Sequence, residues 1–408
     1  MRNQAVQVLT RTLNDGLTID QAIDQVMKDG DSSRSWMQEI SSGTLRWKGR
    51  LDFILNSVSL KKKPSGWLRK ILLTSAYQLI AQDRINRAAV VNETVDEIRE
   101  KEGEAPSRFA NAVLRKISDQ AVQWKDLDGD TAEWASLPEW LWKKICAQQG
   151  LAWAKAFALA CLERPETWIL EGPSLKSSKL GGAAKSGGAV FHHEGFQEGK
   201  FIVQDISNQV LVSEICSEIK KLSGNLPLSA LDLCAAPGGK TIALSWNGFS
   251  VFATDQDTRR LQLIQENLDR LAKNPDLIAM GKITLVERKS VADLPLQDLV
   301  WVDAPCTGTG IIRRHPEIRW NRKESDLLDL TVLQKKLLLE GWEKVKPGGY
   351  LVYSVCSILK EEGPDLVRAA GLSEGLLGAR KIRDWFLVPQ EEPHGDGFWG
   401  VLLGKSGK

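Results

Sequence analysis

The stretch LDLCAAPGGKT, residues 231–241, decides the fold class. A short apolar run that ends in a turn of small residues and passes into a helical pattern indicates a strand, a tight turn and a helix. Gly238 and Gly239 lack a Cβ, so the backbone of this turn is open to close approach by a ligand. No glycine stands five residues before the Gly-Lys-Thr ending, which disfavours the phosphate-binding loop of a nucleoside triphosphatase.

The residues around this stretch alternate between strand and helix patterns. Helical patterns at 257–272 and 327–345 lie between apolar runs that are typical of strands. The expected strands are 229–234, 250–255, 282–287, 298–303, 349–355 and 397–403. This alternation predicts an α/β fold with a mostly parallel sheet covered on both faces, in which ligands bind beyond the carboxyl ends of the strands. Asp255 ends the second strand, where a carboxylate is well placed to accept hydrogen bonds from ribose hydroxyls.

Two cysteines follow neighbouring strands of the expected sheet. Asp303 and Cys306 lie in VDAPCTGTG, residues 302–310, and Cys356 lies in YSVCS, residues 353–357. Neither cysteine has a Cys or His partner at the spacing of a zinc site, so we expect no metal. Either thiol taken alone is best interpreted as buried and inert, whereas a pair beside a ligand-binding turn indicates a nucleophilic thiolate.

The first part of the chain, residues 1–125, is predicted to be helical because its apolar residues recur at helical spacing. Positive charge gathers between residues 46 and 70, where Asp52 is the only acid. The cluster consists of Arg46, Lys48, Arg50, Lys61, Lys62, Lys63, Arg69 and Lys70. These residues form either a solvated helix face or a phosphate-binding patch, since Lys and Arg displace counterions from nucleic acid.

Residues 126–200 are expected to connect this helical domain to the α/β domain at 201–408. Two short helices are predicted around Trp140 and Trp153, followed by loops at 173–182 and 185–188 that are rich in Gly, Ser and Lys.

The composition of the 408 residues fits a soluble globular protein. Hydrophobic residues make up 42% and charged residues 26%, which excludes a mostly disordered chain. The formal net charge is only +2, so any attraction to a polyanion must be local. No apolar run approaches the length of a membrane span, and six cysteines are too few for a disulfide scaffold. We therefore expect a cytoplasmic monomer that has no contact with membranes.

The three segments at the strand ends resemble the Sun/Fmu (RsmB-type) RNA (cytosine-5) methyltransferases. That family carries a Gly-rich cofactor turn, an Asp-Ala-Pro-Cys strand end and a Tyr-x-x-Cys-Ser strand end. The resemblance continues through IIRRHPEIRW (311–320), KPGG (346–349) and GDGF (395–398). Residues 1–120 resemble the NusB-like RNA-binding domain that precedes the catalytic domain in the bacterial ribosomal-RNA member. The matching pieces are GTLRW (43–47), YQLI (77–80) and NAVLR (111–115).

The resemblance implies a Rossmann-like catalytic domain with a mostly parallel seven-stranded sheet. It implies S-adenosyl-L-methionine as methyl donor and a cytosine of 16S ribosomal RNA as acceptor. Carbon 5 of cytosine is a poor nucleophile until a thiolate adds at carbon 6. By the family's pattern Cys356 is that nucleophile and Cys306 helps to release the product. DNA cytosine methyltransferases instead use the cysteine of a Pro-Cys motif as nucleophile, so Cys306 is the alternative candidate for the attacking role. Asp303 would hydrogen-bond the pyrimidine edge or position the sulfonium end of the cofactor. The cofactor would lie on Cys234, Ala235, Ala236, Pro237, Gly238, Gly239 and Lys240, with Asp255 on the ribose.

Two basic surfaces are predicted to hold the RNA. One is the 46–70 cluster with its run Lys61, Lys62 and Lys63. The other follows the Pro-Cys turn and contains Arg313, Arg314, Arg319, Arg322 and Lys323 around Trp320, where a ring can stack on a base while cations hold phosphates.

The chain departs from the family at two positions. Val355 stands where the family has Thr before its nucleophile, and ERKS, residues 287–290, replaces a Gly-Asp that contacts the adenine amine. Two other functions remain open: a transfer-RNA cytosine-5 methyltransferase, and a non-catalytic RNA-binding assembly factor on the same scaffold.

Overall fold

The computed structural model consists of two compact units. The described residues are 1–28, 31–59, 63–172, 176–180, 190, 193–224, 228–274, 281–373 and 376–407. The first unit comprises residues 1–164 and 312–323, and the second comprises residues 165–311 and 324–408. The connector predicted at 126–200 is therefore divided between the two units, and a short segment after the Pro-Cys turn belongs to the first.

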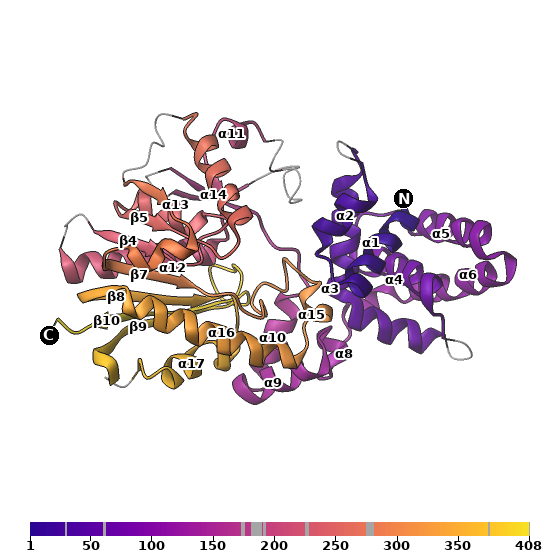
Figure 1. Cartoon of the computed structure of the whole chain (residues 1–408). Helices are drawn as coiled ribbons and strands as arrows, with labels where there is room; N and C mark the ends of the chain where they lie inside the picture. The colour runs from indigo at the N-terminus through magenta and orange to yellow at the C-terminus, as the bar shows by residue number, and fades with distance from the viewer. Residues whose placement is uncertain are drawn as a thin grey trace. The chain divides into compact units, whose positions relative to one another are not determined.

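The first unit is helical throughout its described residues (Figure 1). Its helices are α1 (Arg2–Asp15), α2 (Ile19–Val26), α3 (Arg34–Val58), α4 (Gly66–Ala81), α5 (Arg87–Glu102), α6 (Glu104–Asp119), α7 (Ala121–Lys125), α8 (Ala132–Ala135), α9 (Glu139–Gln149), α10 (Leu151–Ala160) and α15 (Ile318–Asn321). Helix α4 is buried from Ile71 to Ile80, in agreement with the apolar run in its sequence. One hydrophobic core joins α1 to α6, and Trp320 of α15 packs against it.

The second unit contains two sheets. A small antiparallel sheet has the order β2-β1-β3, and a seven-stranded sheet has the order β6-β5-β4-β7-β8-β10-β9. The strands are β1 (Trp168–Glu171), β2 (Lys176–Lys179), β3 (Ile202–Val203), β4 (Ser229–Asp232), β5 (Ser250–Ala253), β6 (Ile283–Leu285), β7 (Gln297–Asp303), β8 (Val345–Val355), β9 (Ala379–Leu387) and β10 (Phe398–Lys405). Strands β6, β5, β4, β7 and β8 run parallel, and β10 is antiparallel to both of its neighbours. The predicted mostly parallel, seven-stranded sheet is thus confirmed.

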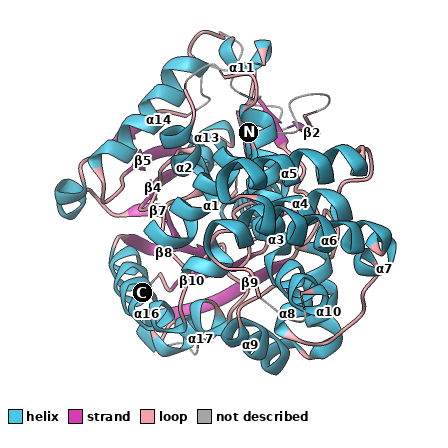
Figure 2. Ribbon diagram, turned by 90° about the vertical axis from the view of Figure 1, so that its right-hand side faces the viewer, coloured by secondary structure: helices cyan, strands magenta, loops and turns pink. Residues whose placement is uncertain are grey.

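Helices cover both faces of the seven-stranded sheet, as Figures 1 and 2 show. In β7, Val300 and Val302 pack on the side of α16 (Glu324–Glu343) and α17 (Pro364–Ala369), whereas Leu299 and Trp301 pack on the side of α12 (Ile206–Ser223) and α13 (Gly239–Trp246). This alternation follows from the two-residue period of a strand that is buried on both faces. The remaining helices of this unit are α11 (Glu194–Gln197) and α14 (Thr258–Leu271).

Two sequence predictions need correction. Residues 176–179, expected to be loop, form β2 and pair with β1, while 173–175 and 181–189 lie outside the described residues. Strand β9 is not among the expected strands, because four of its nine residues are charged and only Ala379 and Trp385 are buried. Within the described residues no helix is both long and apolar enough to cross a membrane.

Candidate active site

The Gly-rich turn joins β4 to α13 as its sequence predicts. Gly238 has φ +104°, a conformation that L side chains rarely adopt, and a Cβ there would lie 3.1 Å from Ile264. The Ala236–Pro237 peptide is cis. A glycine is therefore required at the point where the turn enters the helix.

Helix α14 holds this turn from one side. Asp255 follows β5 and is 3% exposed, and its Oδ2 accepts a hydrogen bond of 3.2 Å from the backbone N of Ala236. From α14, Arg260 donates to the carbonyl of Ala236 (3.0 Å) and Asn267 donates to the carbonyl of Pro237 (3.1 Å). The structure thus brings Asp255 to the predicted cofactor turn. Arg260 and Asn267 were not identified from the sequence.

Asp303 forms an ion pair with Lys240. The Lys240 Nζ lies 2.7 Å from the Asp303 Oδ2, and the other carboxylate oxygen accepts 2.6 Å from the Ser354 hydroxyl. That hydroxyl accepts in turn from the Trp301 indole N–H at 3.0 Å. Lys240 also lies over the Phe398 ring, 5.4 Å from its centroid. The acid at the end of β7 and the lysine of the Gly-rich turn are therefore paired, which the sequence spacing does not reveal.

The two candidate catalytic cysteines are adjacent. Cys306 follows β7 and Cys356 follows β8, and their Sγ atoms lie 3.2 Å apart. Cys306 is 8% exposed and Cys356 is half-buried. The hydrogen bond with Cys356 and, after it, burial raise the pKa of Cys306 well above its usual value. The more accessible Cys356 is accordingly the better placed of the two to meet a substrate.

Two other acidic groups lie beside the turn, the buried Asp232 and the half-buried Cys234. Burial raises the pKa of Asp232 to about 7, even though its Oδ2 accepts 2.7 Å from the Thr241 hydroxyl. Burial and neighbouring carboxylates likewise raise the pKa of the Cys234 thiol. A thiol held in its neutral form has little nucleophilicity, so Cys234 contributes its backbone to the turn rather than a reactive sulfur.

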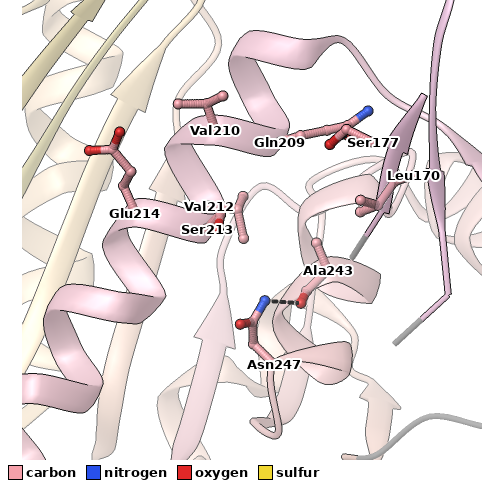
Figure 3. Close-up of a pocket in the computed structure, with 9 residues that line it drawn as sticks. All are labelled: Leu170, Ser177, Gln209, Val210, Val212, Ser213, Glu214, Ala243 and Asn247. Atoms are coloured by element: carbon pink, nitrogen blue, oxygen red, sulfur yellow. Dashed lines mark hydrogen bonds between the residues drawn. The ribbon is translucent and has the colours of Figure 1, made fainter. Parts of the chain in front are cut away.

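A cavity of about 230 Å³ lies elsewhere in the second unit (Figure 3). It is lined by α12, α13 and the small sheet, including Gln209, Glu214 and Asn247. None of the site residues predicted from the sequence lines it. The described residues contain no group of three or more His, Cys, Asp or Glu side chains that could hold a metal ion.

The segment after the Pro-Cys turn is not the exposed basic surface that the sequence predicts. Arg313 is 5% exposed and Arg319 is 1% exposed. Arg319 donates to three carbonyls of the first unit, those of Arg46 (3.0 Å), Ser136 (3.0 Å) and Cys161 (2.5 Å). The half-buried Trp320 donates to the carbonyl of Leu45 (2.8 Å). These side chains hold backbone together; Arg314, Arg322 and Lys323 remain candidates for contact with RNA.

Several cations of the 46–70 cluster are buried or paired with an acid in the structure. Arg46 and Arg50 are buried, and Arg50 donates to the carbonyl of Trp134. Lys48 and Arg69 both pair with Asp52. Lys63 is exposed, whereas Lys61 and Lys62 lie outside the described residues. The predicted patch is therefore smaller than the sequence indicates.

Comparison with known proteins identifies the family of the chain. A family model described as 16S rRNA methyltransferase RsmB/F matches residues 226–374, and a NusB family model matches residues 1–119. Ribosomal RNA small subunit methyltransferase B of Proteus mirabilis is 30% identical over 431 residues, covering 99% of this chain and 98% of the relative. The chain belongs to the RsmB/F methyltransferase family. The corresponding protein of Cronobacter sakazakii is 30% identical over 397 residues, covering 90% and 89% of the two chains.

A solved structure shares the fold of this family member. The crystal structure of PH0851 covers 99% of both chains with a TM-score of 0.67 at 19% identity. The resemblance drawn from the strand-end motifs and the NusB-like front end is confirmed.

Proposed function

We propose that this family member methylates carbon 5 of a cytosine in 16S ribosomal RNA, with S-adenosyl-L-methionine as methyl donor and Cys356 as covalent nucleophile. The observation that carries the proposal is the 3.2 Å approach of two thiols next to the Lys240–Asp303 pair. The names of the curated relatives support ribosomal RNA of the small subunit as the substrate.

The residues around the Gly-rich turn suit a cationic cofactor. S-Adenosyl-L-methionine carries a sulfonium and an ammonium group. The strand ends offer the acids Asp232, Asp255 and Asp303 against two cations, Lys240 and Arg260, of which Arg260 lies 3.4 Å from Asp255. The turn, from Cys234 to Lys240, would hold the cofactor, with Asp255 on the ribose. When bound, this group supplies the methyl that is transferred.

The two thiols have different roles in the reaction at the cytosine ring. The Cys356 thiolate adds to carbon 6 of the cytosine, which makes carbon 5 nucleophilic enough to accept the methyl group. A base then takes the carbon 5 proton, the electron pair of that C–H bond re-forms the C5=C6 double bond, and Cys356 leaves carbon 6 as a thiolate; Cys306 assists this release. Asp303 hydrogen-bonds the pyrimidine edge or orients the donor, and Lys240 fixes the position of its carboxylate. The base must leave any helical stack to reach Cys356.

RNA outside the active site is held by cations of the two predicted surfaces that are not buried. Among the described residues, the candidates are the exposed Lys63 and Lys323 and the half-buried Arg314 and Arg322. The expected setting is a monomer in the cytoplasm.

Cysteine variants test the mechanism. Cys356→Ser should abolish methyl transfer and form no adduct, whereas Cys306→Ala should accumulate a denaturant-resistant protein–RNA complex because release stalls. Cys216→Ser, a change at a buried thiol of α12, serves as the matched control. An adduct with Cys356→Ser and none with Cys306→Ala would reverse the two roles.

Substrate assignment needs a second experiment. Bisulfite sequencing of ribosomal and transfer RNA from a deletion strain should show one cytosine of 16S RNA that loses its modification. Loss confined to transfer RNA would identify the other substrate, and no loss in either would favour the non-catalytic assembly factor.

A further inference from the structure

The turn that carries Cys306 is held on both sides by two buried side chains outside the family motifs described above. Glu362, in the short helix η5 (Lys360–Glu362), is 0% exposed, and Gln334 of α16 is also 0% exposed. Glu362 accepts a hydrogen bond from the backbone N of Thr307 at 2.8 Å and another from the Thr307 hydroxyl. Gln334 Nε2 donates to the carbonyl of Pro305 at 2.9 Å. The peptide groups on either side of Cys306 are thus both fixed.

The two side chains also fix each other. Gln334 Nε2 lies 2.9 Å from the Glu362 Oε1, so a single amide group bridges Pro305 and the carboxylate. The Tyr353 hydroxyl donates to the backbone carbonyl of Glu362 at 2.8 Å, which ties η5 to β8, the strand that Cys356 follows. All of these partners of the Glu362 side chain are donors, so it acts as an acceptor for the whole turn.

The position of Cys306 relative to Cys356 depends on this arrangement. A backbone anchored before and after Cys306 sets the direction of its Cα–Cβ bond, and hence the 3.2 Å separation of the two sulfur atoms. The Glu362 carboxylate also adds to the rise in the pKa of Cys306, since a nearby negative charge disfavours a thiolate. A displacement of about 1 Å at a reacting group can cost roughly a hundredfold in rate.

We propose that Glu362 and Gln334 form a clamp that positions Cys306 for release of the methylated base. This inference rests on the proposed function, since it assigns the clamp to the release step. Both are positioning residues, because their side chains hydrogen-bond to the backbone on either side of Cys306 and to each other.

Single-turnover measurements separate the clamp from the rest of the site. Glu362→Ala and Gln334→Leu should transfer the methyl group but release the RNA roughly a hundredfold more slowly, so that the denaturant-resistant complex accumulates. Glu362→Gln keeps an acceptor for the Thr307 N–H, so it should release RNA faster than Glu362→Ala but more slowly than wild type. Affinity for S-adenosyl-L-methionine should not change in any of them. Glu361→Ala, the neighbouring change in the same short helix, should release RNA at the wild-type rate.

A double-mutant cycle decides between positioning and general loss of structure. Because the clamp acts only through Cys306, Glu362→Ala should slow release no further in a Cys306→Ala background. A folded Glu362→Ala or Gln334→Leu protein that releases RNA like wild type, or additive effects in the cycle, would overturn the clamp. If Glu362→Ala does not fold, the same comparison is made with Gln334→Leu. Failure of Cys306→Ala itself to accumulate the complex would instead refute the proposed release role of Cys306.

Discussion

Arg319 offers a direct test of whether the basic segment after the Pro-Cys turn is structural. Its guanidinium donates to the carbonyls of Arg46, Ser136 and Cys161, three residues that are themselves buried. Arg319→Met keeps the length of the side chain but leaves these three acceptors without their donor. An unsatisfied buried acceptor costs about 1–3 kcal/mol, and removal of the buried charge offsets part of the sum. The Arg46 carbonyl lies inside α3 and keeps its helical partner, so the loss comes mainly from the other two carbonyls. We expect a net loss of about 2–4 kcal/mol in the free energy of unfolding.

The assay is thermal unfolding of the full chain, followed by circular dichroism. At about 2–4 °C per kcal/mol, the melting temperature of the first unit should fall on the order of 10 °C. Lys323→Ala, an exposed change in the same segment, should melt like wild type. The reasoning would be refuted if Arg319→Met melted normally while the salt slope of RNA binding fell by about one unit, which is the signature of a lost phosphate contact.

Three further predictions concern the catalytic unit. Gly310→Ala should impair folding or methyl transfer, because its Cβ would lie 2.1 Å from the carbonyl oxygen of Gly397, whereas Gly407→Ala meets nothing within 4 Å; thermal melts and activity of both variants check this. Asp255→Ala should weaken S-adenosyl-L-methionine binding by about 1–3 kcal/mol in calorimetry, and an unchanged affinity would remove Asp255 from the cofactor site. Burial raises the pKa of Asp232 from 3.8 to about 7, so its contribution to stability is present below about pH 4 and is lost as the pH rises to about 7. Asp232→Asn should flatten that decline in urea titrations between pH 4 and 7, and an equally steep decline would contradict the assignment.

The sequence predicts the sheet well where the strands are short apolar runs. Strands β4 to β8 and β10 are apolar enough to stand out, and all six occur near the expected positions. Strand β9, with the sequence ARKIRDWFL, does not stand out. It lies at the edge of the sheet, so its backbone hydrogen-bonds to one neighbouring strand only, and its charged side chains stay in solvent. Strand β2, KSSK, carries no apolar residue at all.

The candidate site was found from motifs, but its internal contacts were not. Lys240 and Asp303 were each named, yet only the sheet order, which places β4 beside β7, shows that they pair. Glu362 and Gln334 belong to no motif, because their role depends on two peptide groups that the fold brings to them. The sequence prediction for Arg319 is wrong for a related reason: the sequence does not show whether a basic side chain faces solvent or donates to buried carbonyls, as Arg319 does.

The division of the chain has a consequence for its synthesis. The polypeptide passes between the two units at 164/165, 311/312 and 323/324, and the segment between the last two crossings supplies Arg319 and Trp320 to the first unit. A chain growing on the ribosome therefore emerges with its helical unit incomplete until residue 323 has been made, although domains generally fold in order from the N-terminus. Until then the carbonyls of Arg46, Ser136 and Cys161 lack the hydrogen bonds that the Arg319 side chain donates in the complete chain. A fragment that ends at residue 164 should be a less stable protein than the same helices in the full chain.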